Sequence, residues 1–125
     1  GDFDLCKKMI MLAKVSGCDF VKIQKRDPDT CVPENQKMKI RDTPWGKMTY
    51  LDYKKKIEFS EDQIVELLAY SKEIGINFFA SVWDKESCDV MSHYTKIGKI
   101  PSALINDLSN ESIISSTAIK AHFFN

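Results

Sequence analysis

The stretch "CDFVKIQKRD", residues 18–27, decides the fold. Apolar Val21 and Ile23 alternate there with polar Lys22 and Gln24, and this alternation predicts a β-strand with two different faces. Val and Ile are typical of a buried parallel strand, whereas burying a lysine is costly unless a partner compensates its charge. We therefore expect a ligand or a partner for Lys22 on its own face of the strand.

A helix precedes this strand in the predicted order of elements. Asp2 or Asp4 can cap its start, and Gly17 is the expected stop. The apolar spacing i, i+4, i+7 and i+8 predicts one buried stripe, which consists of Leu5, Met9, Leu12 and Ala13.

Further helices and strands alternate after residue 59. Residues 60–63, "SEDQ", form a capping box that starts a second helix, which continues through Ile64, Leu67, Leu68 and Ile74 to Gly75. We expect strands at Ile76–Trp83 ("INFFASVW") and at residues 97–102 ("IGKIPS"), with a helix over Lys85–Thr95 between them. Residues 25–59 hold three prolines and one glycine within a long loop, and loops of this length are often functional.

Alternating helices and strands imply parallel strands joined by right-handed crossovers. The fold class is therefore α/β, and we expect a partial (β/α)8 TIM barrel of about three βα units. A closed barrel needs roughly 250 residues, and this sequence has 125, so we expect a fragment of a longer protein.

Composition narrows the class of protein. The chain is 43% hydrophobic and 29% charged, with eighteen basic and eighteen acidic residues, which is typical of a globular domain and gives no indication of nucleic-acid binding. No apolar run is long enough to span a membrane and no signal peptide is evident, so we expect a cytoplasmic protein that binds no membrane.

The four cysteines lack C-x-x-C spacing, and we expect them to be thiols and not disulfides. Residues 25–56 carry nine basic and five acidic residues, which either create a local field that can attract an anion or simply keep a solvated loop soluble.

Polar side chains recur at the ends of the predicted strands. Alternation places Lys22 and Gln24 on one face of the first strand, and Ser81 and Lys99 on the corresponding faces of the next two, with Ser102 just beyond. The carboxyl ends of parallel strands are where such folds bind ligands. Ammonium groups and hydroxyls there predict a pocket for phosphate or carboxylate, although each lysine by itself also fits a solvated strand end.

Four motifs resemble the N-acetylneuraminate (sialic acid) synthase family. They are "AKVSGCDFVKIQKRD", "TPWGKMTYLDYKKKIEFS", "GINFFASVWD" and "KIPSA", and they occur in the family's order over about residues 1–108. The resemblance implies a barrel enzyme, a transferase of sialic acid biosynthesis, that condenses phosphoenolpyruvate with N-acetylmannosamine or a related amino sugar to give a nonulosonic acid and phosphate. It also implies a divalent metal, Mn or Mg, and we expect the complete protein to be a homodimer and this fragment alone to be inactive.

The family's substrate-binding positions map onto residues already singled out. The resemblance implies that Lys22 contacts phosphoenolpyruvate, that Gln24 lies near the sugar, and that Ser81, Lys99 and Ser102 hold the substrate. Leu104 stands where some members have a glutamate that touches the sugar. The implied metal ligands lie outside the chain, and no catalytic residue is assigned within it.

Several features depart from the family or leave alternatives open. His93 and His122 lack metal-site spacing, so we expect surface or packing roles. Residues 109–125, "SNESIISSTAIKAHFFN", diverge from the family, which predicts a synthase-like domain at 1–108 and a divergent segment at 109–125. A Schiff-base aldolase, with Lys22 or Lys99 as nucleophile, and a non-catalytic remnant or interaction module remain alternatives.

Overall fold

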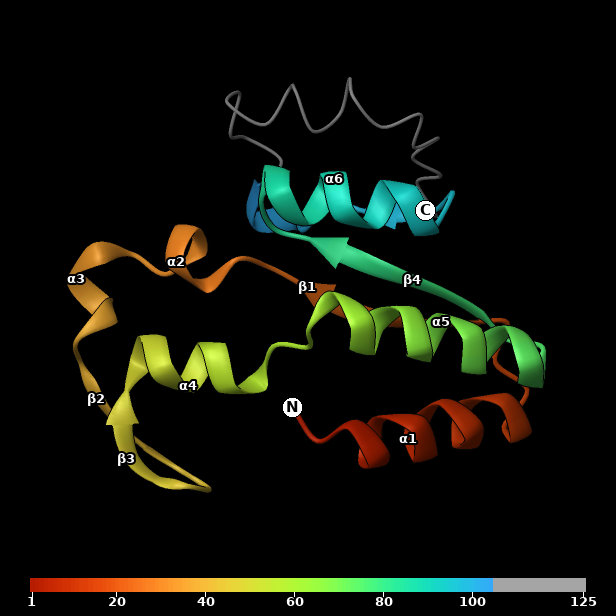
Figure 1. Cartoon of the computed structure of the whole chain (residues 1–125), viewed down its shortest axis with the longest axis horizontal. Helices are drawn as coiled ribbons and strands as arrows, with labels where there is room; N and C mark the ends of the chain where they lie inside the picture. Colours follow the sequence, from red (N-terminus) through yellow and green to blue (C-terminus); the bar gives the residue numbers. More distant parts are fainter. Residues whose placement is uncertain (105–125) are drawn as a thin grey trace.

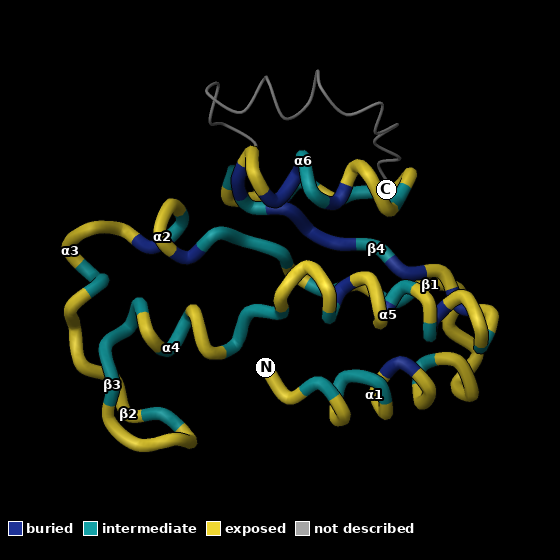
Figure 2. The backbone as a smooth tube through the Cα atoms, viewed as in Figure 1, coloured by how far each residue is buried: buried dark blue, intermediate teal, exposed yellow. Residues whose placement is uncertain are grey.

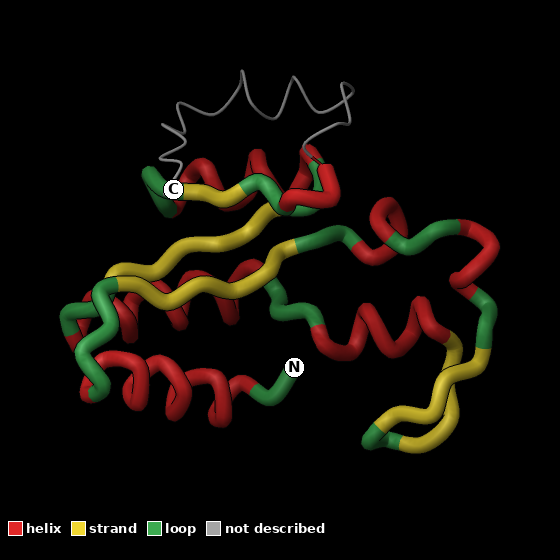
Figure 3. Tube along the Cα trace, turned by 180° about the vertical axis from the view of Figure 1, so that it is seen from behind, coloured by secondary structure: helices red, strands yellow, loops and turns green. Residues whose placement is uncertain are grey.

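The structure, a computed structural model, describes residues 1–104. Its centre is a parallel three-stranded sheet in the order β1 (Phe20–Lys25), β4 (Asn77–Val82) and β5 (Gly98–Lys99). Helices α1 (Phe3–Val15), α5 (Glu61–Ile74) and α6 (Lys85–Tyr94) alternate with these strands along the chain (Figure 1). Seen from behind, β1 and β4 run side by side, as their register requires (Figure 3). The predicted α/β fold with parallel strands is confirmed.

One face of the sheet forms the core with the helices. Val21 and Ile23 of β1, and Phe78, Ala80 and Val82 of β4, pack against apolar side chains of the helices. The helical contribution comes from Ile10 in α1, Ile64 and Leu67 in α5, and Cys88 and Met91 in α6. Strand β4 is accordingly the most deeply buried strand (Figure 2). The strand alternation inferred from the sequence is confirmed on this face.

Helix α1 presents a different stripe to the core than the sequence predicted. The predicted stripe is wrong at three of its four positions, because Leu5, Met9 and Leu12 are 51%, 62% and 62% exposed. Ile10 is buried, and Phe3, Cys6 and Ala13 pack beside it. These residues are spaced i, i+3, i+7 and i+10, so the helix carries two apolar stripes that both satisfy helical periodicity. Packing against α5 and β1 selected the second one.

Local signals set the helix ends. Asp2 caps α1 by accepting the backbone N–H of Leu5, and Ser60 and Gln63 form the predicted capping box of α5. Gly75 ends α5 at φ 74°, a left-handed conformation that glycine adopts without strain. Asp84 caps α6 by accepting from Ser87 N.

The segment between β1 and α5 has more regular structure than predicted. Its residues 28–57, called the arm below, contain two helical turns, α2 (Pro28–Cys31) and α3 (Glu34–Lys37), an antiparallel hairpin, β2 (Ile40–Thr43) with β3 (Gly46–Thr49), and helix α4 (Tyr50–Ile57). The expectation of a continuous loop over 25–59 is therefore wrong. The arm extends to one side of the sheet and its helices α3 and α4 bury no residue fully (Figures 1 and 2).

Short-range signals explain the arm's elements. Gly46, at φ 95°, makes the tight turn of the hairpin possible, and Thr43 accepts the backbone N–H of Trp45 through its hydroxyl oxygen. Thr49 caps α4 by accepting from Asp52 N and donates its hydroxyl to the Asp52 carboxylate. The two partners in each of these contacts are only two or three residues apart, and hydrophobic periodicity does not reveal such contacts.

The last described element, η1 (Ser102–Leu104), is a 3-10 turn that follows β5. The predicted boundary at residues 108/109, the segment 109–125 and His122 lie outside the described residues. Within residues 1–104, no helix is long and apolar enough to cross a membrane.

Candidate functional site

The carboxyl ends of the three strands carry a row of polar residues. The register pairs Gln24 with Ser81 and Ser81 with Lys99, so these residues lie side by side on β1, β4 and β5. Residues paired in this way point to the same face of a parallel sheet, which here is the face opposite the helices. We call it the open face. Ser81 is buried at 2% exposure, whereas Gln24 and Lys99 are exposed.

The other two predicted site residues lie next to this row. Lys22 is two residues before Gln24 on β1, pairs with Phe79 and is exposed, so it shares the open face. Ser102 is exposed in η1, three residues beyond Lys99. The structure therefore places both lysines on one face of the sheet. Their roles in binding substrate stay predictions.

Lys25 belongs to the opposite face. Its ammonium donates to the backbone carbonyl of Phe59 at 3.2 Å, on the side of β1 that also carries Ile23. Strand alternation thus separates two lysines three residues apart: Lys22 is available on the open face, and Lys25 fixes the segment that precedes α5.

A group of side chains around Arg26, directly after β1, was not predicted from the sequence. The guanidinium Nη2 of Arg26 donates to Gln24 Oε1, its Nε lies 2.6 Å from Glu58 Oε1, and its central carbon lies 5.4 Å from the Trp83 ring. The side chains of Arg26 and Glu58 are only 15% and 11% exposed. Burial raises the pKa of Glu58, and the charges of Arg26 and Lys25 oppose this rise. In the sequence, the only sign of this group was the pair of charged residues, Arg26 and Asp27, directly after β1.

Asp84 joins the ends of β1 and β4. It is 4% exposed, and its carboxylate accepts the backbone N–H of Asp27 at 2.6 Å, the backbone N–H of Ser87 at 2.7 Å and the Ser87 hydroxyl at 2.9 Å. The Cys31 thiol lies 3.3 Å from the same carboxylate. Burial and the contact with Asp84 raise the pKa of Cys31 to about 12, so this thiol stays protonated. The buried carboxylate thereby holds the chain at Asp27, the residue after Arg26.

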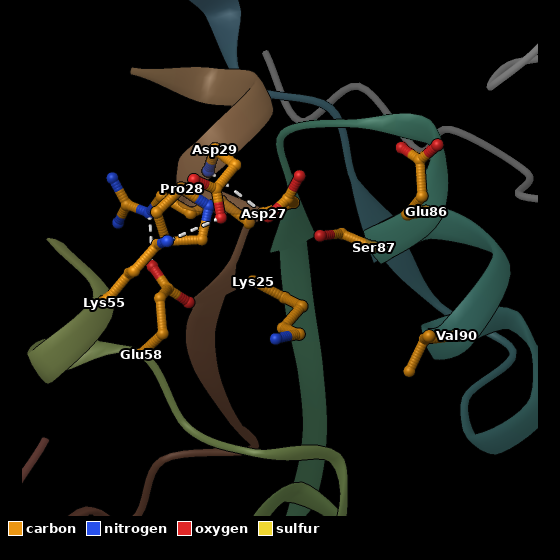
Figure 4. A pocket seen from close by; sticks show the side chains of 10 residues that line it. Lys25, Asp27, Pro28, Asp29, Lys55, Glu58, Glu86, Ser87 and Val90 are labelled. Carbon is orange, nitrogen blue, oxygen red and sulfur yellow. Dashed lines mark hydrogen bonds and ion pairs between the residues drawn. The ribbon is translucent and has the colours of Figure 1, made fainter. Parts of the chain in front are cut away.

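A cavity of about 270 Å³ lies beside this junction, between the base of the arm and α6. Lys55, Asp29 and Glu58 approach from the arm side, and Ser87, Glu86 and Val90 come from α6 (Figure 4). Lys55 pairs with Asp29 at 2.8 Å, and Glu58 pairs with Arg26. The charged groups therefore compensate each other, and this cavity lacks the excess of positive charge that an anion site needs.

The described residues provide no metal-binding set. Within residues 1–104, no three His, Cys, Asp or Glu side chains come together as ligands. His93 is exposed and its Nδ1 lies 2.7 Å from the backbone oxygen of Asp89, which fits the surface role expected for it. The implied requirement for a divalent metal stays a prediction.

Comparison with known proteins supplies the family. The model of the NeuB family matches residues 9–121, most of the chain. This chain belongs to the NeuB family. It is thus a member of the sialic acid synthase group that its motifs resembled. The matched residues include all five predicted site residues and Arg26.

Two curated relatives show how much of a NeuB-family protein this chain spans. It is 39% identical over 94 residues to the N-acetylneuraminate-9-phosphate synthase of Drosophila melanogaster, a match that covers 74% of this chain and 25% of that protein. It is 32% identical over 134 aligned positions to the N,N'-diacetyllegionaminic acid synthase of Campylobacter jejuni, which covers 95% of this chain and 39% of that protein. The chain therefore spans between a quarter and two fifths of these relatives.

A solved structure shows the fold. The crystal structure of N-acetylneuraminic acid (sialic acid) synthetase from Leptospira borgpetersenii, in complex with citrate, matches with a TM-score of 0.77 and 21% identity. The match covers 93% of this chain and 37% of that one. The three βα units of this NeuB-family chain are accordingly part of a TIM barrel, as the order of helices and strands predicted.

Proposed function

We propose that this chain contributes the phosphoenolpyruvate-binding strands of a synthase that makes a nonulosonic acid. The reaction joins phosphoenolpyruvate to N-acetylmannosamine or a related amino sugar and releases phosphate. The observation that carries the proposal is the row of Gln24, Ser81 and Lys99 at the strand ends, with Lys22 on the same face, in a chain of the NeuB family. The relatives named as synthases support this reaction class.

The chemistry of this condensation explains why lysines and serines occur at the site. C3 of phosphoenolpyruvate attacks the aldehyde carbon of the open-chain sugar and forms the new C–C bond. Water then adds at C2, and phosphate leaves from the tetrahedral intermediate as the C2 ketone forms. Lys22 and Lys99 supply positive charge to the carboxylate and phosphate of the substrate, and Ser81 and Ser102 supply directed hydroxyl donors. This role of the four residues is preorganised electrostatic stabilisation and not acid–base catalysis.

A divalent metal bound in the complete enzyme would polarise the sugar aldehyde. Residues 1–104 do not offer its ligands, so no step assigned to this chain depends on it. Leu104, intermediate in exposure at the end of η1, lies just after Ser102 and marks a position where the choice of sugar can differ between members of the family.

The alternative of a Schiff-base aldolase fits the site less well. A lysine that forms a Schiff base needs a desolvated neutral amine, whereas within residues 1–104 Lys22 and Lys99 are both exposed on the open face. Two exposed ammonium groups beside hydroxyls suit an anion instead.

The test is an assay of the full-length protein with phosphoenolpyruvate, a divalent metal and a panel of amino sugars, in which released phosphate and nonulosonic acid are both measured. We expect the two products in equal amounts with at least one sugar. Lys22→Met keeps the stem of the side chain and removes its charge, so we expect phosphoenolpyruvate affinity to fall about tenfold to a hundredfold in a folded variant. Covalent trapping by borohydride with pyruvate, or no turnover with any sugar and metal, would contradict the proposal.

A further inference from the structure

We propose that Arg26 is a positioning residue that sets the orientation of the Gln24 side-chain amide, so that Gln24 offers N–H donors to an acceptor oxygen of the sugar. This inference rests on the proposed function, because it concerns how the same site selects its sugar. It adds Arg26, with Glu58 and Trp83 as its supports, to a site that the sequence analysis built from Lys22, Gln24, Ser81, Lys99 and Ser102.

The chemistry of arginine fixes the polarity of the amide. A guanidinium has only N–H donors and no acceptor, so the amide atom of Gln24 that faces it must be the oxygen. The NH2 group of Gln24 is then directed away from Arg26. A ligand beside it must present a lone pair, which a sugar hydroxyl or an acyl carbonyl provides.

The position of Gln24 makes this orientation relevant to the substrate. Gln24 is exposed on the open face, in register with buried Ser81. An exposed glutamine without a partner can turn its amide by 180° at little cost, and it then distinguishes poorly between donors and acceptors. The contact with Arg26 removes this ambiguity.

Arg26 is itself held in three directions. Its Nε lies 2.6 Å from the Glu58 carboxylate, its face is near the Trp83 ring, and its Nη2 is on Gln24. At 15% exposure, with these contacts made, the guanidinium is a support for Gln24 and a poor candidate for direct contact with the phosphate of the substrate. Glu58 comes from the segment after α4, so the end of the arm is connected to Gln24 through Arg26.

The experiment uses the full-length protein in a Glu58→Gln background, because removing Arg26 alone would leave a buried carboxylate without its partner. Arg26→Met in this background keeps the side-chain stem and removes all five donors. We expect the KM for the sugar to rise about threefold to tenfold, the range for one neutral hydrogen bond, with the KM for phosphoenolpyruvate within twofold. Circular dichroism confirms folding.

Two further variants separate positioning from a purely structural role. In a Gln24→Ala, Glu58→Gln background, Arg26→Met should change the sugar KM by less than twofold, because Arg26 acts through Gln24. Arg26→Lys keeps a positive charge and three N–H donors on a flexible stem, and we expect it to recover part of the lost sugar affinity relative to Arg26→Met.

The outcomes distinguish this inference from the proposed function. A wild-type protein without condensation activity would contradict the proposed function and remove the sugar on which the inference depends. An active wild type in which Arg26→Met leaves the sugar KM unchanged, or raises the KM for phosphoenolpyruvate instead, would overturn the inference alone. Full additivity of Arg26→Met and Gln24→Ala would overturn it as well.

Discussion

The sheet layer and the arm are stabilised in different ways. The layer, made of α1, β1, α5, β4 and α6, contains the buried apolar side chains of the core. In the arm, Pro28 and Val32 are buried near its start, whereas β2, β3, α3 and α4 contain no buried residue. Its structure depends on caps, ion pairs and contacts such as Lys56 over the Trp45 ring at 5.2 Å. Burial stabilises the first region, and short-range polar contacts shape the second.

This difference indicates how the two regions serve the site. The layer fixes the row of Gln24, Ser81 and Lys99, because neighbouring strands cannot shift register without exposing the aliphatic face. Glu58 directly follows the arm and pairs with Arg26 beside that row. A small movement of the arm can therefore change the surroundings of Gln24 while the strands stay in place.

The largest effect is expected from a cavity in the layer. Leu67 is fully buried in α5, so Leu67→Ala should lower the free energy of unfolding of the full-length protein by about 2–5 kcal/mol. Met38 in the arm is 76% exposed, and Met38→Ala should change the free energy of unfolding by no more than about 0.5 kcal/mol. Denaturant unfolding of both variants measures the contrast. Similar losses for the two substitutions would show that the arm is part of the core.

A smaller effect is expected from the helix caps, and it should differ in extent between the regions. Thr49→Ala removes the cap of α4, which contributes about 1 kcal/mol, and amide hydrogen exchange should become about fivefold faster in α4. The matched change Ser60→Ala removes the cap of α5 in the layer. We expect Thr49→Ala to leave exchange in β1 and β4 unchanged, whereas Ser60→Ala should accelerate it there too. Acceleration in β4 after Thr49→Ala would mean that the arm and the layer open together.

The smallest effect concerns the two carboxyls that flank the arm, Glu58 and Asp27. Burial raises the pKa of Glu58, so the folded protein binds this proton more tightly than the unfolded chain does. Its contribution to stability is greatest at low pH and declines as the pH rises through the folded pKa. We therefore expect the stability of the wild type, relative to Glu58→Gln, to fall as the pH rises from below about 4.3, the ordinary pKa of glutamate, to neutrality.

Asp27, directly before the arm, should show the opposite dependence. A hydrogen bond from the Thr30 hydroxyl lowers its pKa, with further help from the backbone N–H groups of Asp29 and Thr30. Its contribution is present above the unfolded pKa and is lost as the pH falls through the folded pKa. Unfolding of wild type, Glu58→Gln and Asp27→Asn, measured from neutral pH to well below about 3.9, the ordinary pKa of aspartate, tests both carboxyls. The same sign of pH dependence for the two carboxyls would contradict the environments described for them.

Local patterns in the sequence were enough for the elements of the layer and for the row of predicted site residues. Val21 and Ile23 alternate with Lys22 and Gln24 over a few positions, and backbone geometry alone converts that alternation into two faces. The capping box at Ser60 and the glycine at 75 act over three or four residues. The parallel order of strands then follows from the connections, and it places Ser81 and Lys99 beside Gln24.

Tertiary structure decided what these patterns leave open. Helix α1 has two apolar stripes, and only its packing against α5 and β1 determines that Ile10 is buried while Met9 is 62% exposed. The partners of Arg26 lie far along the chain at Glu58 and Trp83, and Asp27 meets Asp84 across 57 residues. Periodicity describes neighbours a few residues apart, whereas these contacts exist only after the ends of β1, α4 and β4 have been brought together. The sequence by itself therefore determined the strands and their faces. The fold decided which charged groups surround Gln24.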